Sequence, residues 1–153
     1  PADNRTDYIK RLVGLPGDKI QFIDTNLYIN NSEILKSRIS KNDIIFCGKK
    51  IIEVFTFEEV LPNKKIHNTV YSKNYTYKDS DIFIVPENHY FFLGDNRDCS
   101  KDSRFLSEVG YVNKLNLGGK AKIIVFSNDT KTSGFLKYWN WTKSNRLEGL
   151  YKR

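Results

Sequence analysis

The chain is poor in the residues from which metal, redox and phosphate-binding motifs are built. Its 153 residues include two cysteines, two histidines and 9 glycines. Neither Cys47 nor Cys99 has a second cysteine at C-x-x-C spacing, and His67 and His89 stand without companion ligands. No glycine-rich stretch is suited to cradling a phosphate. We therefore expect no metal and no cofactor.

The two cysteines leave their redox state open. Cys47 and Cys99 could form a disulfide in an oxidising compartment, but nothing in their spacing requires it. Of these alternatives, we expect two free, partly buried thiols.

Long apolar runs are also missing. No stretch is long enough to cross a bilayer, and no signal peptide is recognisable. The chain starts at Pro1 and not at an initiator methionine. We expect it to be a processed or excised piece of a longer protein.

The charge is basic, with 25 Lys and Arg against 18 Asp and Glu and a pI of about 9.3. A net charge of +7 suits nucleic acid or an anionic membrane surface. The basic residues are spread along the chain, with no run of five. A solvated basic surface is therefore at least as well supported as either partner.

Composition favours a mostly β fold. Hydrophobic residues make up 39% and aromatic residues 14%, which is enough for a real core, and the length fits one domain or a core with a modest insertion. Aromatic and β-branched residues are dense, and long helical periodicity is missing. A turn is expected over 15–18, a loop or at most one helical turn over 58–65, and a tyrosine-rich edge hairpin over 70–77. Strands are expected over 8–14, 19–24, 27–30, 44–47, 51–57, 82–85, 90–93 and 121–127.

One polar segment, residues 94–104 (the 94–104 loop), stands out. Its sequence is Gly-Asp-Asn-Arg-Asp-Cys-Ser-Lys-Asp-Ser-Arg, and it directly follows the apolar run 90–93. A buried strand would deliver this loop to one fixed place, where chemistry tends to be located. The alternative is a solvated turn.

Lys10 is a second candidate for chemistry. Strand alternation puts Lys10 on the same face as Tyr8 and Leu12. A lysine that apolar neighbours desolvate is more easily held neutral, and a neutral amine can act as a general base towards a serine hydroxyl. A surface lysine is the ordinary alternative.

Together, two segments resemble a known family. Residues 8–18, Tyr-Ile-Lys-Arg-Leu-Val-Gly-Leu-Pro-Gly-Asp, are similar to the lysine box of bacterial type I signal peptidases (leader peptidases). The 94–104 loop resembles the second catalytic box of the same family. Weaker similarity continues through 115–127. The resemblance implies a signal-peptidase-like β catalytic core and a membrane-anchored serine endopeptidase with a Ser/Lys dyad.

The resemblance also implies residue roles. Lys10 matches the general base, and Ser100 matches the serine that hydrogen-bonds and orients this lysine. Tyr8 and Ile9 match positions beside the substrate pockets, where an extended substrate would add to the sheet edge. Such enzymes remove signal peptides after small residues, typically Ala-X-Ala.

A set of charged residues is expected to hold the loop against the strand. The resemblance pairs Asp95 with Arg11 and Asp102 with Arg104. The full supporting set is Arg11, Asp95, Arg97, Asp98, Asp102 and Arg104.

The chain departs from the family pattern at two places. Cys99 replaces the usual asparagine of the second box, a neighbour of the site, so activity should survive the change. The family's nucleophilic serine lies upstream of the lysine box, but residues 1–9 contain no serine. We therefore expect the chain alone to be inactive.

The expected organisation is a catalytic core of residues 1–22 and 82–153 with a β insertion over 23–81. By resemblance, the expected location is the bacterial inner membrane, with the catalytic domain on the periplasmic side. The expected partners are preprotein signal peptides and an anionic membrane surface, and not nucleic acid. Trp139 and Trp141 could rest on lipid or fold onto the core, and both alternatives stay open.

Two other functions compete with this hypothesis. A self-cleaving Ser/Lys protease would share the dyad but lacks the Gly-Asp-Asn-Arg-Asp stretch of the 94–104 loop. A basic β-domain could bind single-stranded nucleic acid through stacked aromatics, but that function leaves both boxes unexplained.

Overall fold

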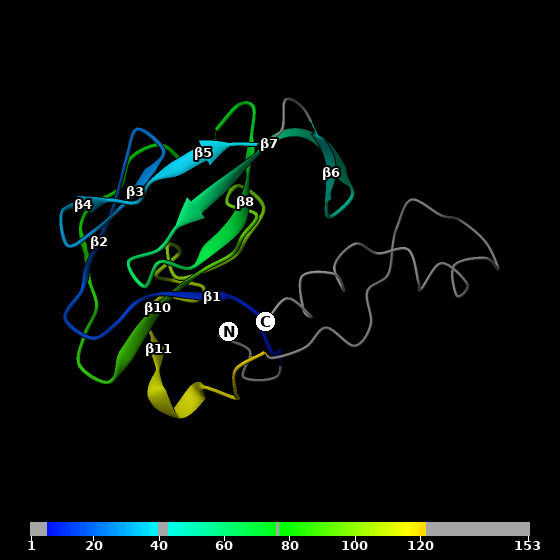
Figure 1. Cartoon of the computed structure of the whole chain (residues 1–153). Helices are drawn as coiled ribbons and strands as arrows, with labels where there is room; N and C mark the ends of the chain where they lie inside the picture. Colours follow the sequence, from blue (N-terminus) through cyan, green and yellow to red (C-terminus); the bar gives the residue numbers. More distant parts are fainter. Residues whose placement is uncertain (1–5, 40–42, 76, 122–153) are drawn as a thin grey trace, which may run out of the picture. The chain divides into compact units, whose positions relative to one another are not determined.

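A computed structural model describes residues 6–39, 43–75 and 77–121, shown in Figure 1. By contacts, the chain divides into residues 1–117 and 118–153, and all described strands lie in the first unit. Within the described residues the secondary structure is strands and one short 3₁₀ helix, Lys114–Asn116. The predicted mostly β fold is confirmed. Most of the expected strand 121–127 and the whole Trp139–Trp141 segment lie outside the described residues.

The first sheet places the two boxes side by side. Its order is β1 (Arg11–Gly14), β10 (His89–Leu93) and β11 (Val112–Asn113), and neighbouring strands are antiparallel. The register pairs Arg11 with Leu93 and Leu12 with Phe92. The expected strand over 8–14 therefore begins only at Arg11, because β10 ends at Leu93 and offers no further ladder partner.

The second sheet contains the predicted hairpin. Its order is β4 (Ser32–Glu33), β3 (Asn26–Ile29), β2 (Lys19–Ile23) and β9 (Phe83–Ile84). Asp24 and Thr25 connect β2 to β3 with φ angles of 46° and 68°. Tight two-residue hairpin turns need this left-handed backbone.

The third sheet lies in the chain between the boxes. It consists of β5 (Lys36–Arg38), β6 (Asp43–Cys47), β7 (Lys50–Val60) and β8 (Ile66–Ser72), with β7 pairing with the other three. The expected loop over 58–65 and edge hairpin over 70–77 were wrong in part, because β7 continues to Val60 and β8 begins at Ile66. This polar stretch stays in the antiparallel β7–β8 ladder, where Glu58 pairs with Asn68 and Glu59 pairs with His67.

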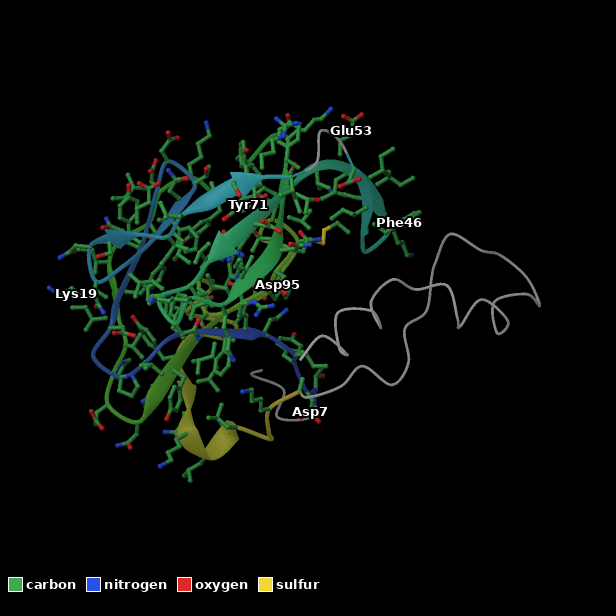
Figure 2. All side chains as sticks on the ribbon, in the orientation of Figure 1. Asp7, Lys19, Phe46, Glu53, Tyr71 and Asp95 are labelled. Carbon is green, nitrogen blue, oxygen red and sulfur yellow. A yellow bond between two sulfur atoms is a disulfide. The ribbon has the colours of Figure 1, made fainter. Side chains whose placement is uncertain are left out.

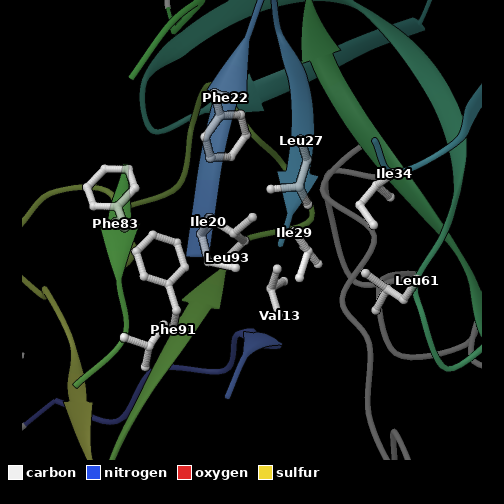
Figure 3. Close-up of a cluster of buried hydrophobic side chains, with 11 residues drawn as sticks. Val13, Ile20, Phe22, Leu27, Ile29, Ile34, Leu61, Phe83, Phe91 and Leu93 are labelled. Atoms are coloured by element: carbon white, nitrogen blue, oxygen red, sulfur yellow. The ribbon is translucent and has the colours of Figure 1, made fainter. Parts of the chain in front are cut away.

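The strands of the first two sheets contribute most side chains of a buried apolar cluster (Figure 3). Phe83 and Phe91 come from different sheets, and their ring centroids lie 5.0 Å apart. Burying each large side chain contributes roughly 1.5–3 kcal/mol. This core gives the site a rigid base. Its members are Val13, Ile20, Phe22, Leu27, Ile29, Ile34, Leu61, Phe83, Val85, Phe91 and Leu93.

The proposed division into a core and an insertion over 23–81 stays a prediction. β2 and β9 flank the stretch and pair with each other, with Lys19 opposite Ile84. The stretch 23–81 therefore begins and ends next to two strands, β2 and β9, that are neighbours in the second sheet.

Candidate active site

The β1–β10 ladder brings Arg11, within residues 8–18, beside the start of the 94–104 loop. Arg11 pairs with Leu93 at the end of the ladder, and Lys10 and Gly94 are the next residues along the two chains. Arg11 also donates two hydrogen bonds to Asp95, from Nε to Oδ1 at 2.7 Å and from Nη2 to Oδ2 at 2.8 Å. The structure thus contains the first pair that the resemblance implied, between residues 84 positions apart.

Lys10 is half-buried just before β1. Its Nζ lies 5.3 Å from the centroid of the Tyr8 ring, a cation–π contact on the side predicted by alternation. Tyr8 and Ile9 are exposed, Ile9 by 85%. Their side chains are therefore accessible to an arriving ligand, although their substrate-pocket roles stay predictions.

Ser100 lies directly over Gly94. A Cβ atom added at Gly94 would come within 2.0 Å of Ser100 Oγ and 2.3 Å of Ser100 Cβ, so only glycine leaves room for this serine. The hydroxyl is buried and has no hydrogen-bond partner among the described residues, so the predicted bond to Lys10 is not formed in this structure. Leaving a buried hydroxyl without a hydrogen-bond partner costs free energy. A donor or acceptor brought next to Ser100 would therefore be stabilised by bonding to it.

The second implied pair is buried inside the 94–104 loop. Asp102 Oδ1 accepts from Arg104 Nε at 2.8 Å, and Asp102 Oδ2 accepts from the backbone N–H of Gly94 at 2.9 Å. Arg104 also donates to the carbonyl of Arg97. Asp102 therefore closes the loop and fixes the backbone of Gly94.

Arg97, a third supporting residue, is buried and reaches the third sheet. Its Nη2 lies 2.5 Å from Glu59 Oε2, and its Nη1 donates to Glu59 Oε1 at 2.8 Å and to the Tyr71 hydroxyl at 2.7 Å. The Tyr71 hydroxyl donates in turn to Glu59 Oε1 at 2.8 Å. Burial is the main cause that raises the pKa of Tyr71.

Glu59 is a site residue that sequence reasoning missed. It shares the inward face of β7 with Phe57, two positions earlier. A carboxylate on an apolar strand face signals a buried cationic partner, because an unpaired buried charge is too costly. That alternation was the available clue.

Asp98, the last supporting residue, anchors the loop to β8. Its Oδ2 accepts the backbone N–H of Ser72 at 2.8 Å. The Asn96 side chain accepts the N–H of Cys99 at 3.2 Å, closing a local turn. All six predicted supporting residues thus lie in the loop or at its contacts (Figure 2 labels Asp95).

The chain matches the family described as signal peptidase, peptidase S26, over residues 1–126. The chain belongs to this family. It is 38% identical to signal peptidase I of Rickettsia conorii and 39% identical to that of Rickettsia typhi. These alignments cover 99% of the chain but 60% and 61% of the relatives, so the chain spans about 60% of their length.

A solved structure is also similar. The crystal structure of a signal peptidase I from Enterococcus faecalis V583 is 28% identical, with a TM-score of 0.41, covering 74% of this chain and 80% of that one. The S26 signal peptidases are membrane-associated serine endopeptidases. No helix within the described ranges combines the length and apolar content needed to span a bilayer.

One expectation about this family member was wrong. Cys47 and Cys99 form a disulfide, with their Cα atoms 5.7 Å apart, and are not free thiols (Figure 2). The fold places the end of β6 beside the 94–104 loop, although the two cysteines are 52 positions apart. Cys99, the departure from the family pattern, thus ties the loop to the third sheet.

His67 lies beside the buried ion pair. Its Nε2 is 3.6 Å from Glu59 Oε2, and neither ring nitrogen has a hydrogen-bond partner among the described residues. Burial lowers the pKa of His67, and the nearby Arg11 lowers it further. The lowered pKa favours the neutral form of this buried ring. No cluster of three or more metal-ligating side chains occurs in the described ranges.

Proposed function

We propose that this chain supplies the general-base part of a signal peptidase I, which removes N-terminal signal peptides from exported preproteins after small residues. Lys10 is the general base and Ser100 the residue that orients it. The family assignment supports the reaction class. The roles of Lys10 and Ser100 in the dyad are those that the resemblance implies.

The observation that supports the proposal is the contact between Ser100 and Gly94. Ser100 lies on Gly94 with a buried hydroxyl that has no hydrogen-bond partner among the described residues. Lys10 and Gly94 are each the next residue after the last pair of the β1–β10 ladder, Arg11 and Leu93. A lysine amine turning towards this hydroxyl would satisfy it. The two boxes, far apart in sequence, would then meet at one hydrogen bond.

In the proposed reaction, neutral Lys10 takes the proton from a nucleophilic serine as its oxygen bonds to the scissile carbonyl carbon. The ammonium then returns the proton to the leaving amine when the C–N bond breaks. Water hydrolyses the ester by the same proton route. We assign no nucleophile among the 153 residues.

Substrate binding is proposed along β1. Within the described residues β1 pairs only with β10, so its other edge can accept an extended peptide as a further strand. The exposed side chains of Tyr8 and Ile9 lie next to this edge. These positions would contact the small residues before the cleavage site.

The proposed location is the bacterial inner membrane, with this domain on the periplasmic side. The disulfide supports that side, because disulfides persist in oxidising compartments and are rare in the cytosol. The net charge of +7 suits an anionic membrane surface as a neighbour. Nucleic acid is not among the proposed partners.

Lys10→Ala tests the proposal in the product of the complete gene, with cleavage of a purified preprotein as the assay. We expect a loss of about 100-fold or more in kcat, because a positioned general base contributes at least that much. Lys19→Ala on β2 is the matched control, since Lys19 belongs to the second sheet and lies away from Asp95 of the loop (Figure 2). Full cleavage by Lys10→Ala would end the assignment of the base.

A further inference from the structure

The 94–104 loop rests on the edge of β8, a strand from outside both boxes. The Val70 N–H donates to the carbonyl of Asp95 at 2.8 Å, and the Arg97 N–H donates to the carbonyl of Val70 at 2.9 Å. These bonds make a parallel bridge between Val70 and Asn96. The start of the loop thus behaves as a short extra strand on the third sheet.

Two side chains of the third sheet, Glu59 on β7 and Tyr71 on β8, also bond to the 94–104 loop through Arg97. Glu59 and Arg97 form a two-bonded ion pair whose side chains are each only 1% exposed. The Tyr71 hydroxyl bonds to both partners, so the three groups form a closed ring of hydrogen bonds. Burial holds Glu59 and Arg97 in one geometry, because any displacement would leave a buried charge unpaired.

The same arginine reaches the residue beneath Ser100. Arg97 Nε donates to the carbonyl of Gly94 at 3.3 Å, while Asp102 accepts the N–H of Gly94. Both backbone polar groups of Gly94 are therefore held by buried side chains. Ser100 is in close contact with this glycine, so a shift of Arg97 would change where its hydroxyl lies.

We propose that Glu59 and Tyr71 are positioning residues that act through Arg97 and Gly94 to place the Ser100 hydroxyl. This inference rests on the proposed function, since it presumes the role of Ser100. It also gives β7 and β8, which belong to neither box, a function: they hold the 94–104 loop in its active position.

The first test measures amide hydrogen exchange in the 153-residue chain and needs no activity. The probes are the N–H groups of Val70 and Arg97, which make the two backbone bonds. We expect exchange at both to speed up about tenfold in Tyr71→Phe, which loses two hydrogen bonds but keeps its ring. Tyr75→Phe, whose ring contacts that of Tyr71, is the control.

Glu59→Gln is the stronger variant, and Glu53→Gln is its matched control on the same strand. Glu53 pairs with Lys73 at the surface and contacts no residue of the loop among the described hydrogen bonds and ion pairs. If Glu59→Gln does not fold, Tyr71→Phe still decides the question. Unchanged exchange at Val70 and Arg97 in the folded variants would overturn the proposal.

The second test is a double-mutant cycle with Ser100→Ala in the product of the complete gene. We expect Tyr71→Phe to lower kcat by about tenfold with KM unchanged, and to have no further effect once Ser100 is alanine. An additive loss would mean that Tyr71 acts by general stability, which contradicts the proposal.

The two tests separate this inference from the proposed function. If Ser100→Ala leaves kcat unchanged, the assigned role of Ser100 is wrong and placement of its hydroxyl loses its purpose. The exchange rates then still show whether Glu59 and Tyr71 hold the loop.

Discussion

Two ion pairs join the 94–104 loop to neighbouring strands, and they differ sharply in solvent exposure. Arg11–Asp95 joins the loop to β1 at the surface, with side chains 34% and 45% exposed. Arg97–Glu59 joins it to β7 in the interior, with both side chains 1% exposed. Water screens the first pair and competes for its hydrogen bonds, whereas the second pair is buried away from bulk water. The outer pair links the loop to β1, and the inner pair links it to β7.

Breaking the inner pair should have the largest effect. Glu59→Ala leaves the guanidinium of Arg97 buried without a counter-charge, so we expect a loss of about 3–5 kcal/mol in the free energy of unfolding. Urea denaturation measures it. Glu53→Ala, which breaks the exposed pair with Lys73, should cost at most about 1 kcal/mol. Equal losses in the two variants would contradict the contrast between interior and surface pairs.

The disulfide is a third, covalent tether between the loop and the third sheet. Replacing both Cys47 and Cys99 with serine should lower the free energy of unfolding by about 2–4 kcal/mol. A reducing agent should destabilise the parent chain by a similar amount and leave the serine variant unaffected. An effect of reductant on both would point to another cause.

A larger side chain at Gly94, the residue in contact with Ser100, should have an intermediate effect on stability. Gly94→Ala places a methyl group 2.0 Å from Ser100 Oγ, so we expect a loss of about 1–3 kcal/mol and a displaced hydroxyl. Adding Ser100→Gly removes the clashing atoms. Thermal unfolding should show recovered stability in the double variant, and no recovery would locate the strain elsewhere.

Breaking the outer pair should have the smallest effect. Asp95→Asn should lower the free energy of unfolding by no more than about 1 kcal/mol, since the pair is solvent-exposed. The loss should shrink further in high salt, which screens exposed charges. Urea titrations at low and high ionic strength measure both. A loss as large as that of Glu59→Ala would make the two pairs equivalent.

Much of the site was predictable because its residues lie in two short stretches. The apolar run 90–93 correctly indicates a strand that delivers the 94–104 loop, and the resemblance implied the Arg11–Asp95 and Asp102–Arg104 pairs that the structure contains. Local sequence fixes such features because strand, turn and loop follow one another directly.

The remaining features depend on contacts between distant residues. Glu59 lies in the stretch 58–65 that was expected to be a loop, and its partner Arg97 comes 38 positions later. Cys47 and Cys99 show no spacing signal, because only the path of β6 brings them together. The start of β1 at Arg11 likewise depends on where its partner strand ends.

The Cys47–Cys99 bond also defines a covalent ring within the chain. Glu59, Tyr71 and Arg97 all lie between the two cysteines, so the ring encloses the whole inner ion-pair network. Even an unfolded chain would keep these groups at a high effective concentration relative to one another. In an oxidising compartment, the disulfide therefore keeps Glu59, Tyr71 and Arg97 within one covalent ring of the chain.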